Sequence, residues 1–108
     1  MGKSQNLLQG TLDLLILHAL RNDVMHGYAI AQRVHLLSDE VLVVEEGSLY
    51  PALSRLELDG CISSTWGASE NNRKAKFYKI TARGKKVLAG EQQNWERLSA
   101  AVQQVLAR

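Results

Sequence analysis

The sequence predicts a mainly α-helical protein with one small β-hairpin, an α+β fold. The chain has 108 residues, with one proline, one cysteine and 45% hydrophobic residues, which is the size of a single globular domain. Three early segments carry apolar residues at helical spacing, two later segments alternate as strands do, and the final segment is helical again. We expect one domain whose small core is either just sufficient or completed by a second chain.

Composition excludes several classes of protein. The lone Cys61 rules out a disulfide framework and a cysteine-based zinc cluster, and it fits a reducing compartment. The apolar stretch 12–20 is too short to span a bilayer, and the first residues do not resemble a signal peptide. The three histidines lack metal-ligand spacing, and no catalytic constellation accompanies the carboxylates. We therefore expect a cytoplasmic protein that is not an enzyme and has no cofactor, metal site or membrane contact.

The first helix is predicted at residues 11–22. Apolar residues make one stripe along it, and Leu14 and Leu17 extend the apolar surface to the opposite side, so two of its sides should be covered. A small monomer rarely buries a helix all round, which makes one side a candidate contact with another chain. The stripe consists of Leu12, Leu15, Ile16, Ala19 and Leu20.

The second helix is predicted at residues 26–37 and the third from about residue 47 to residue 59. In the third, Ser48 is expected as the N-cap, Pro51 falls in the first turn, and Gly60 suits the left-handed position after the helix. The buried stripe of this helix is Leu49, Leu53 and Leu56, and its opposite face presents Ser48, Tyr50, Pro51, Ser54 and Arg55.

Two strand-like segments, residues 61–66 and 74–80, follow the third helix. A polar, turn-rich stretch joins them, which predicts a β-hairpin lying on the helices. Period-two alternation places Ile62 and Trp66 on the same face of the first strand. We expect Trp66 to pack beneath the hairpin.

The last segment, residues 81–108, predicts one helix of up to about 42 Å. Apolar residues follow a heptad-like stripe in which Glu91 is the one polar member. Two heptads are too few for an isolated coiled coil, so this stripe should pack on the first helix of the same or a partner chain. A homodimer is the favoured hypothesis, and the stripe comprises Leu88, Trp95, Leu98, Val102 and Val105.

Charge is distributed unevenly along the chain, although the formal net charge is only +2. Residues 1–60 contain 4 Lys/Arg and 8 Asp/Glu, residues 61–86 contain 7 and 1, and residues 87–108 contain 2 of each. Positive charge concentrated in 26 residues suits contact with a polyanion. A basic but merely solvated hairpin is the alternative.

The order helix, helix, helix, hairpin predicts a winged helix-turn-helix domain at residues 1–80, followed by a dimerisation helix at residues 81–108. In such domains the third helix enters the major groove and the hairpin, or wing, contacts the DNA backbone. Serine and arginine side chains would read bases, and wing cations and a tyrosine would bind phosphates. The predicted DNA-binding residues are Tyr28, Ser48, Tyr50, Pro51, Ser54, Arg55, Arg73, Lys74 and Lys76.

Several motifs in order resemble the PadR family of bacterial transcriptional repressors. GSLY at residues 47–50 matches the opening of that family's recognition helix, RLELDG at residues 55–60 its end, and YKIT at residues 78–81 the step after the wing. The segments LLQGTLDLLILHAL and HGYAIAQ are similar to the first two helices of the family. The resemblance extends over nearly the whole chain.

This resemblance implies a dimeric repressor of a palindromic operator, with an interface made by the first and last helices. The single C-terminal helix is similar to the smaller PadR subfamily, in which some members bind flat hydrophobic compounds beside a tryptophan at the dimer centre. Trp95 matches that tryptophan, and it either stacks on a small hydrophobic or aromatic effector or only packs the interface. The predicted dimerisation residues are Leu8, Leu12, Leu15, Leu88, Trp95, Leu98, Val102 and Val105.

Two other functions remain open at this point. A winged helix can serve as a protein-interaction module without specific DNA binding, with the acidic first half as its contact surface. A dedicated small-molecule carrier would bind at Trp95 without any change in DNA affinity.

Overall fold

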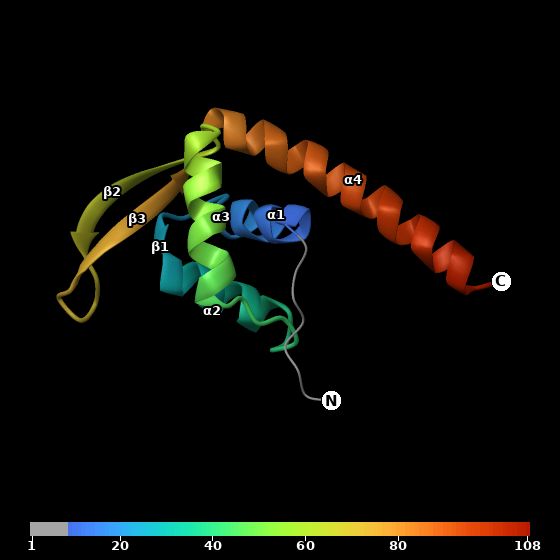
Figure 1. The fold of residues 1–108 in the computed structure, drawn as a ribbon, viewed down its shortest axis with the longest axis horizontal. Helices are drawn as coiled ribbons and strands as arrows, with labels where there is room; N and C mark the ends of the chain where they lie inside the picture. The colour runs from blue at the N-terminus through green and yellow to red at the C-terminus, as the bar shows by residue number, and fades with distance from the viewer. Residues whose placement is uncertain (1–8) are drawn as a thin grey trace.

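The computed structural model describes residues 9–108, which form four helices and a three-stranded sheet (Figure 1). Helix α3 crosses the centre, the hairpin projects to one side, and α4 extends to the other. The elements in chain order are α1 Gln9–Ala19, β1 Met25–His26, α2 Gly27–Leu37, α3 Glu46–Leu58, β2 Ile62–Ala68, β3 Lys74–Ile80 and α4 Ala82–Leu106. The predicted fold class is confirmed.

Helix α3 begins earlier than predicted, so the expectation that Ser48 is its N-cap was wrong. Glu45 is the N-cap residue and makes no side-chain capping hydrogen bond. The amide groups of Ser48 and Leu49 both donate to the carbonyl of Glu45. Pro51 therefore lies beyond the first turn, where it cannot donate to the carbonyl four residues before it.

The sheet contains a short strand, β1, that the sequence did not predict. It pairs antiparallel with β3, giving the order β1-β3-β2, and it pairs Met25 with Tyr78 and His26 with Phe77. Two residues are too few to show an alternating pattern. Next to this strand, the Nδ1 atom of His26 accepts a hydrogen bond from the amide of Ala29 at 3.2 Å and so caps α2. The start of α2 is thereby attached to the base of the wing.

The hydrophobic core lies between the three N-terminal helices and the base of the hairpin. Helix α1 packs against α2, α3 and α4, so the prediction that it is covered on two sides is confirmed. Leu14 and Leu15 are only partly buried against this core. The largest fully buried side chains are Ile16, Leu17, Leu20, Ile30, Leu49, Leu53 and Ile62.

The end of α3, the base of the wing and the start of α4 meet at one junction, visible at the top of Figure 1. Gly60 follows α3 with a φ of +77°, a left-handed conformation that favours glycine. The hydroxyl of Thr81 donates to the carbonyl of Gly60 at 2.6 Å and accepts from the amide of Gly84 at 3.0 Å. A Cβ atom at Gly84 would overlap the carbonyl oxygen of Cys61.

Replacing Gly84 by alanine should therefore destabilise the protein, by about 2 kcal/mol or more, because the neighbouring atom is backbone and cannot rotate away. The matched control is Gly90→Ala in the same helix, where an added Cβ meets nothing within 4 Å. That change should stabilise the protein by up to about 1 kcal/mol through helix propensity. Urea unfolding, followed by circular dichroism at one protein concentration, measures the free energy of unfolding of both variants. Equal effects of the two substitutions would contradict the close approach of Gly84 to Cys61.

Candidate nucleic-acid interface

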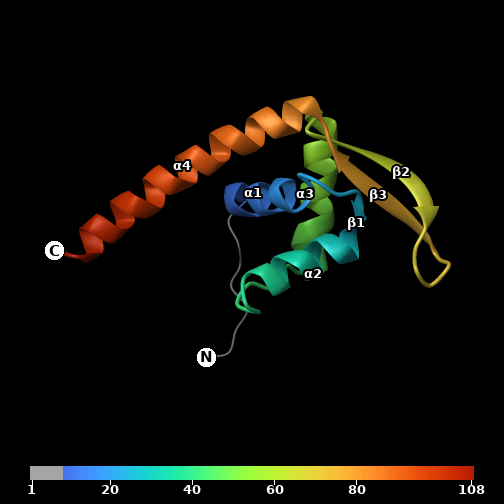
Figure 2. The same ribbon diagram turned by 180° about the vertical axis from the view of Figure 1, so that it is seen from behind.

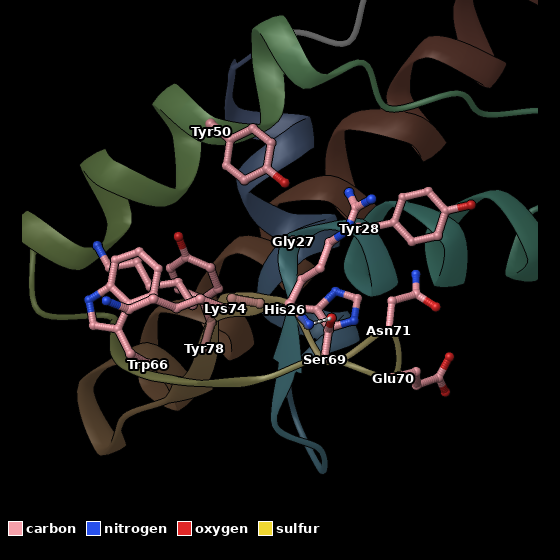
Figure 3. Close-up of a pocket in the computed structure, with 13 residues that line it drawn as sticks. His26, Gly27, Tyr28, Tyr50, Trp66, Ser69, Glu70, Asn71, Lys74 and Tyr78 are labelled. Carbon is pink, nitrogen blue, oxygen red and sulfur yellow. Dashed lines mark hydrogen bonds between the residues drawn. The ribbon is translucent and has the colours of Figure 1, made fainter.

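A cleft of about 610 Å³ lies between the start of α2, the exposed side of α3 and the wing. Figure 3 shows Tyr50 entering it from α3, while Trp66 and Lys74 enter from the wing. Phenol, indole and cationic groups therefore face one open space. The lining residues are His26, Gly27, Tyr28, Tyr50, Trp66, Ser69, Glu70, Asn71, Arg73, Lys74, Ala75, Lys76 and Tyr78.

The wing supplies the positive charge of this cleft. Arg73 and Lys74 are exposed, and neither forms an ion pair with a carboxylate in the part of the chain that the structure describes. The Lys74 ammonium lies 5.1 Å from the centre of the Trp66 ring, a cation–π distance. Lys76 differs, because its Nζ atom lies 3.6 Å from Oε1 of Glu57. Arg73 and Lys74 are the cations most available to an anion.

The exposed side of α3 carries short or neutral side chains. Ser48, Pro51 and Ser54 are exposed, as predicted from the helical spacing. The ring of Tyr50 lies directly over Gly27, since a Cβ atom there would be 2.8 Å from the ring. Tyr28 is also exposed, and its ring stacks on that of His26 with 6.5 Å between centroids. Both tyrosines thus lie where α2 and α3 approach each other.

Arg55 occupies a different place from the one predicted for a base-reading residue. Its Nη2 atom donates to Oδ1 of Asp13 in α1 at 2.5 Å, and both side chains are half-buried. The guanidinium therefore points toward the helical core and is already paired. Burial raises the pKa of the Asp13 carboxyl, while the hydrogen bond and charge of Arg55 lower it. Arg55 thus holds α3 against α1, and base reading by Arg55 stays a prediction.

Trp66 was expected to pack beneath the hairpin, and this prediction was wrong. Its side chain is 62% exposed, because β2 leaves the core after Ile62. Lys76 is its cross-strand partner, and its ring faces the ammonium groups of Lys74 and Lys76. The sequence did contain a signal for this position, because Lys74 and Lys76 alternate along the strand that pairs with the strand of Trp66.

The residues predicted to form a dimer fall into two groups. Leu12 and Leu88 are buried in the core of the protomer, and Leu15 is partly buried against it. The members of the α4 stripe beyond Leu88 are 45% to 72% exposed: Trp95, Leu98, Val102 and Val105. Leu8 lies outside the described residues. Figure 2 shows the C-terminal half of α4 extending past the other helices.

A second, smaller cavity of about 210 Å³ lies between α1 and α4. Trp95 and Leu98 line it from α4, and Leu14 lines it from α1. The lining contains both apolar and polar side chains, and an effector bound in this cavity would contact Trp95.

Residues 9–108 contain no cluster of three or more His, Cys, Asp or Glu side chains suited to a metal ion. No helix within the same residues is both long enough and apolar enough to cross a membrane.

Comparisons with known proteins point to one family. Residues 16–90 match the sequence model of the "Transcriptional regulator PadR-like family". A transcriptional regulator from Clostridium thermocellum is 31% identical, with a TM-score of 0.80 over 89% of this chain and 93% of its own. A PadR family transcriptional regulator from Eggerthella lenta is 33% identical, with a TM-score of 0.75 over 91% and 83%. "Uncharacterized protein X" from Lysinibacillus sphaericus is 29% identical over 90 residues, 83% of each chain.

Replacing Arg55 by methionine should raise the pKa of Asp13 further, because the two contributions of Arg55 that lower it are lost. When the pKa of a carboxyl is higher in the folded state than in the unfolded state, the folded protein loses stability as the pH rises through the folded-state pKa. The destabilisation caused by Arg55→Met should therefore be largest at neutral pH and shrink below the ordinary pKa of aspartate.

Carboxyl ¹³C titration and urea unfolding at several pH values measure these effects. The control is Arg33→Met, which removes the same charge from the exposed pair with Asp23. An unchanged or lower Asp13 pKa in Arg55→Met would contradict the ion pair between Arg55 and Asp13.

Proposed function

This chain belongs to the PadR-like family of transcriptional regulators, which bind DNA, and we propose that it is a homodimeric repressor of a palindromic operator. The observation that carries the proposal is the cleft in which the unpaired wing cations Arg73 and Lys74 face the polar side of α3. A phosphodiester backbone is the polyanion that fits such a cleft, with α3 in the major groove on one side of it. The protein would act in the cytoplasm.

Phosphate binding would come from the wing and from the start of α2. Arg73 and Lys74 supply charge without a competing carboxylate. Amide groups at the first turn of α2, near Gly27 and Tyr28, add the positive end of a helix dipole. The hydroxyls of Tyr28 and Tyr50 are neutral donors suited to phosphate oxygens.

Base reading would fall to Ser48 and Ser54, which lie on the exposed face of α3. Serine can pair with several bases, so a pair of serines discriminates less than one bidentate arginine. With Arg55 held by Asp13, part of the specificity should come from the shape and flexibility of the operator.

The exposed stripe of α4 is the proposed dimer interface. Exposed Leu98, Val102 and Val105 form an apolar surface on a helix that the rest of the protomer does not cover. A two-fold axis through it would place two α3 helices on half-sites about 34–36 Å apart.

Trp95, at the edge of this stripe, is the proposed contact for a flat hydrophobic effector. Such a compound would enter the cavity between α1 and α4 and stack on the indole. To relieve repression it must bind the DNA-free and DNA-bound dimers with different affinities.

Replacing both Arg73 and Lys74 by alanine should weaken binding to every DNA sequence at least tenfold. The slope of log affinity against log salt should become shallower by up to about 1.8, because about 0.9 is expected for each lost phosphate contact. Fluorescence anisotropy at several salt concentrations measures the slope, and a nuclease footprint upstream of the gene locates the operator. The control is Lys85→Ala with Lys86→Ala, which removes the same charge from exposed positions on α4. A parent protein that protects no discrete palindrome would favour the protein-interaction function instead.

Replacing Val102 by glutamate should convert the dimer to a folded monomer, because it buries a charge at the proposed interface without touching the protomer core. Gln103→Glu is the control, since it adds the same charge beside the stripe. Sedimentation equilibrium reports the oligomeric state. If Val102→Glu associates as the parent does, the interface lies elsewhere.

The effector is tested by titrating planar aromatic compounds into the Trp66→Phe dimer, in which Trp95 is the one remaining tryptophan, and following its fluorescence, while DNA affinity is measured with the parent dimer. Quenching without any change in DNA affinity would indicate a carrier.

A further inference from the structure

Glu57 lies where the C-terminal half of α3 meets the wing, and both strands of the wing contact its carboxylate. The hydroxyl of Ser64 in β2 donates to Oε2 at 2.6 Å, and the ammonium of Lys76 in β3 lies 3.6 Å from Oε1. Glu57 and Lys76 are 35% and 40% exposed at their side chains. The pair therefore lies at the edge of the cleft and is partly exposed to solvent.

A carboxylate in this place works against the proposed function of the surface around it. Lys76 lines the same cleft as Arg73 and Lys74, and its ammonium lies 5.9 Å from the Trp66 ring. Unlike those two cations, Lys76 lies beside a carboxylate, which offsets part of its positive charge before DNA approaches. A polyanion approaching the wing would meet two cations without a carboxylate partner and a third, Lys76, whose charge is partly offset by Glu57.

We propose that Glu57 is a positioning residue that retains Lys76 at the base of the wing and limits the sequence-independent affinity of the cleft for phosphate. The inference rests on the proposed DNA binding. Affinity for any duplex grows with the number of phosphates neutralised by free cations. Compensating one cation leaves a larger share of the binding to α3, which lies against the bases.

The central variant is Glu57→Gln, because the glutamine carbonyl still accepts the Ser64 hydrogen bond while the charge that holds Lys76 is lost. Its affinity for a mixed-sequence 20-base-pair duplex should rise about eightfold near 0.1 M salt, and the salt slope should steepen by about 0.9. Lys76→Gln alone should change the slope little. Lys76→Gln in the Glu57→Gln background should abolish the gain, which makes the two substitutions strongly non-additive.

Two matched controls separate this role from simpler ones. Glu40→Gln removes an exposed carboxylate that lies outside the cleft and forms no ion pair in the described residues. It should leave the slope unchanged. Ser64→Ala removes the hydrogen bond to Glu57 and keeps both charges, so it reports a purely structural effect on the wing.

The measurement is fluorescence anisotropy with the full-length dimer, after circular dichroism has shown that each variant is folded. Equal slopes for Glu57→Gln and parent overturn the inference, as does an equal gain in Glu40→Gln or an additive double substitution. If Ser64→Ala reproduces the Glu57→Gln gain, the residue acts only on wing structure and the inference also fails. A parent protein that binds no duplex overturns the proposed function as well, whereas a parent that binds with an unchanged Glu57→Gln slope overturns this inference alone.

Discussion

The functional surfaces of this protein depend on one hydrogen-bonded junction around Thr81. Its amide donates to the carbonyl of Cys61 at 3.0 Å, and its hydroxyl joins the end of α3 to the first turn of α4. Gly84 allows the backbones to approach this closely, because any side chain there would overlap Cys61. Helix α3, the wing and helix α4 all leave from this point (Figure 1). Their relative directions are therefore determined by a few contacts of backbone atoms and of the short Thr81 side chain.

Two of the three charged side chains of α3, Arg55 and Glu57, contact neighbouring elements, while Glu46 in the first turn is exposed. Arg55 pairs with Asp13 on α1, and Glu57 binds Ser64 on the wing. Both contacts attach the helix to its neighbours, and both partly bury a charge that needs a partner. The outward side is left with serines, a proline and a tyrosine, which let a helix approach DNA closely but attract phosphate weakly. Electrostatic affinity then has to come from the wing, in agreement with the concentration of positive charge between residues 61 and 86.

The elements that could be predicted from the sequence are those with a repeating pattern. Helical spacing located the four helices, and alternation with a turn located the hairpin, because many residues contribute to each signal. Strand β1 has only two residues and exists through its pairing with β3. The partner of Arg55 is 42 residues away in the chain, so no local pattern could distinguish a base-reading arginine from one that pairs with α1. Trp66 was misplaced for a related reason, since strand alternation gives the face of a residue but not the point at which the strand leaves the core.

Helix α1 connects the cavity beside Trp95 with the ion pair that holds α3. Leu14 lines the cavity beside Trp95, and Asp13, the preceding residue of the same helix, holds Arg55. Glu91 lines that cavity from α4 and also raises the pKa of Asp13 through its charge, after the larger effect of burial. Because α1 is a continuous helix, anything that displaces it at Leu14 also displaces the carboxylate at Asp13. A partly buried ion pair tolerates such a displacement poorly, since separating the charges leaves each without its partner. In the proposed function, a ligand or a partner chain in the groove between α1 and α4 would therefore act on the orientation of α3 through α1, without a contact between the two sites.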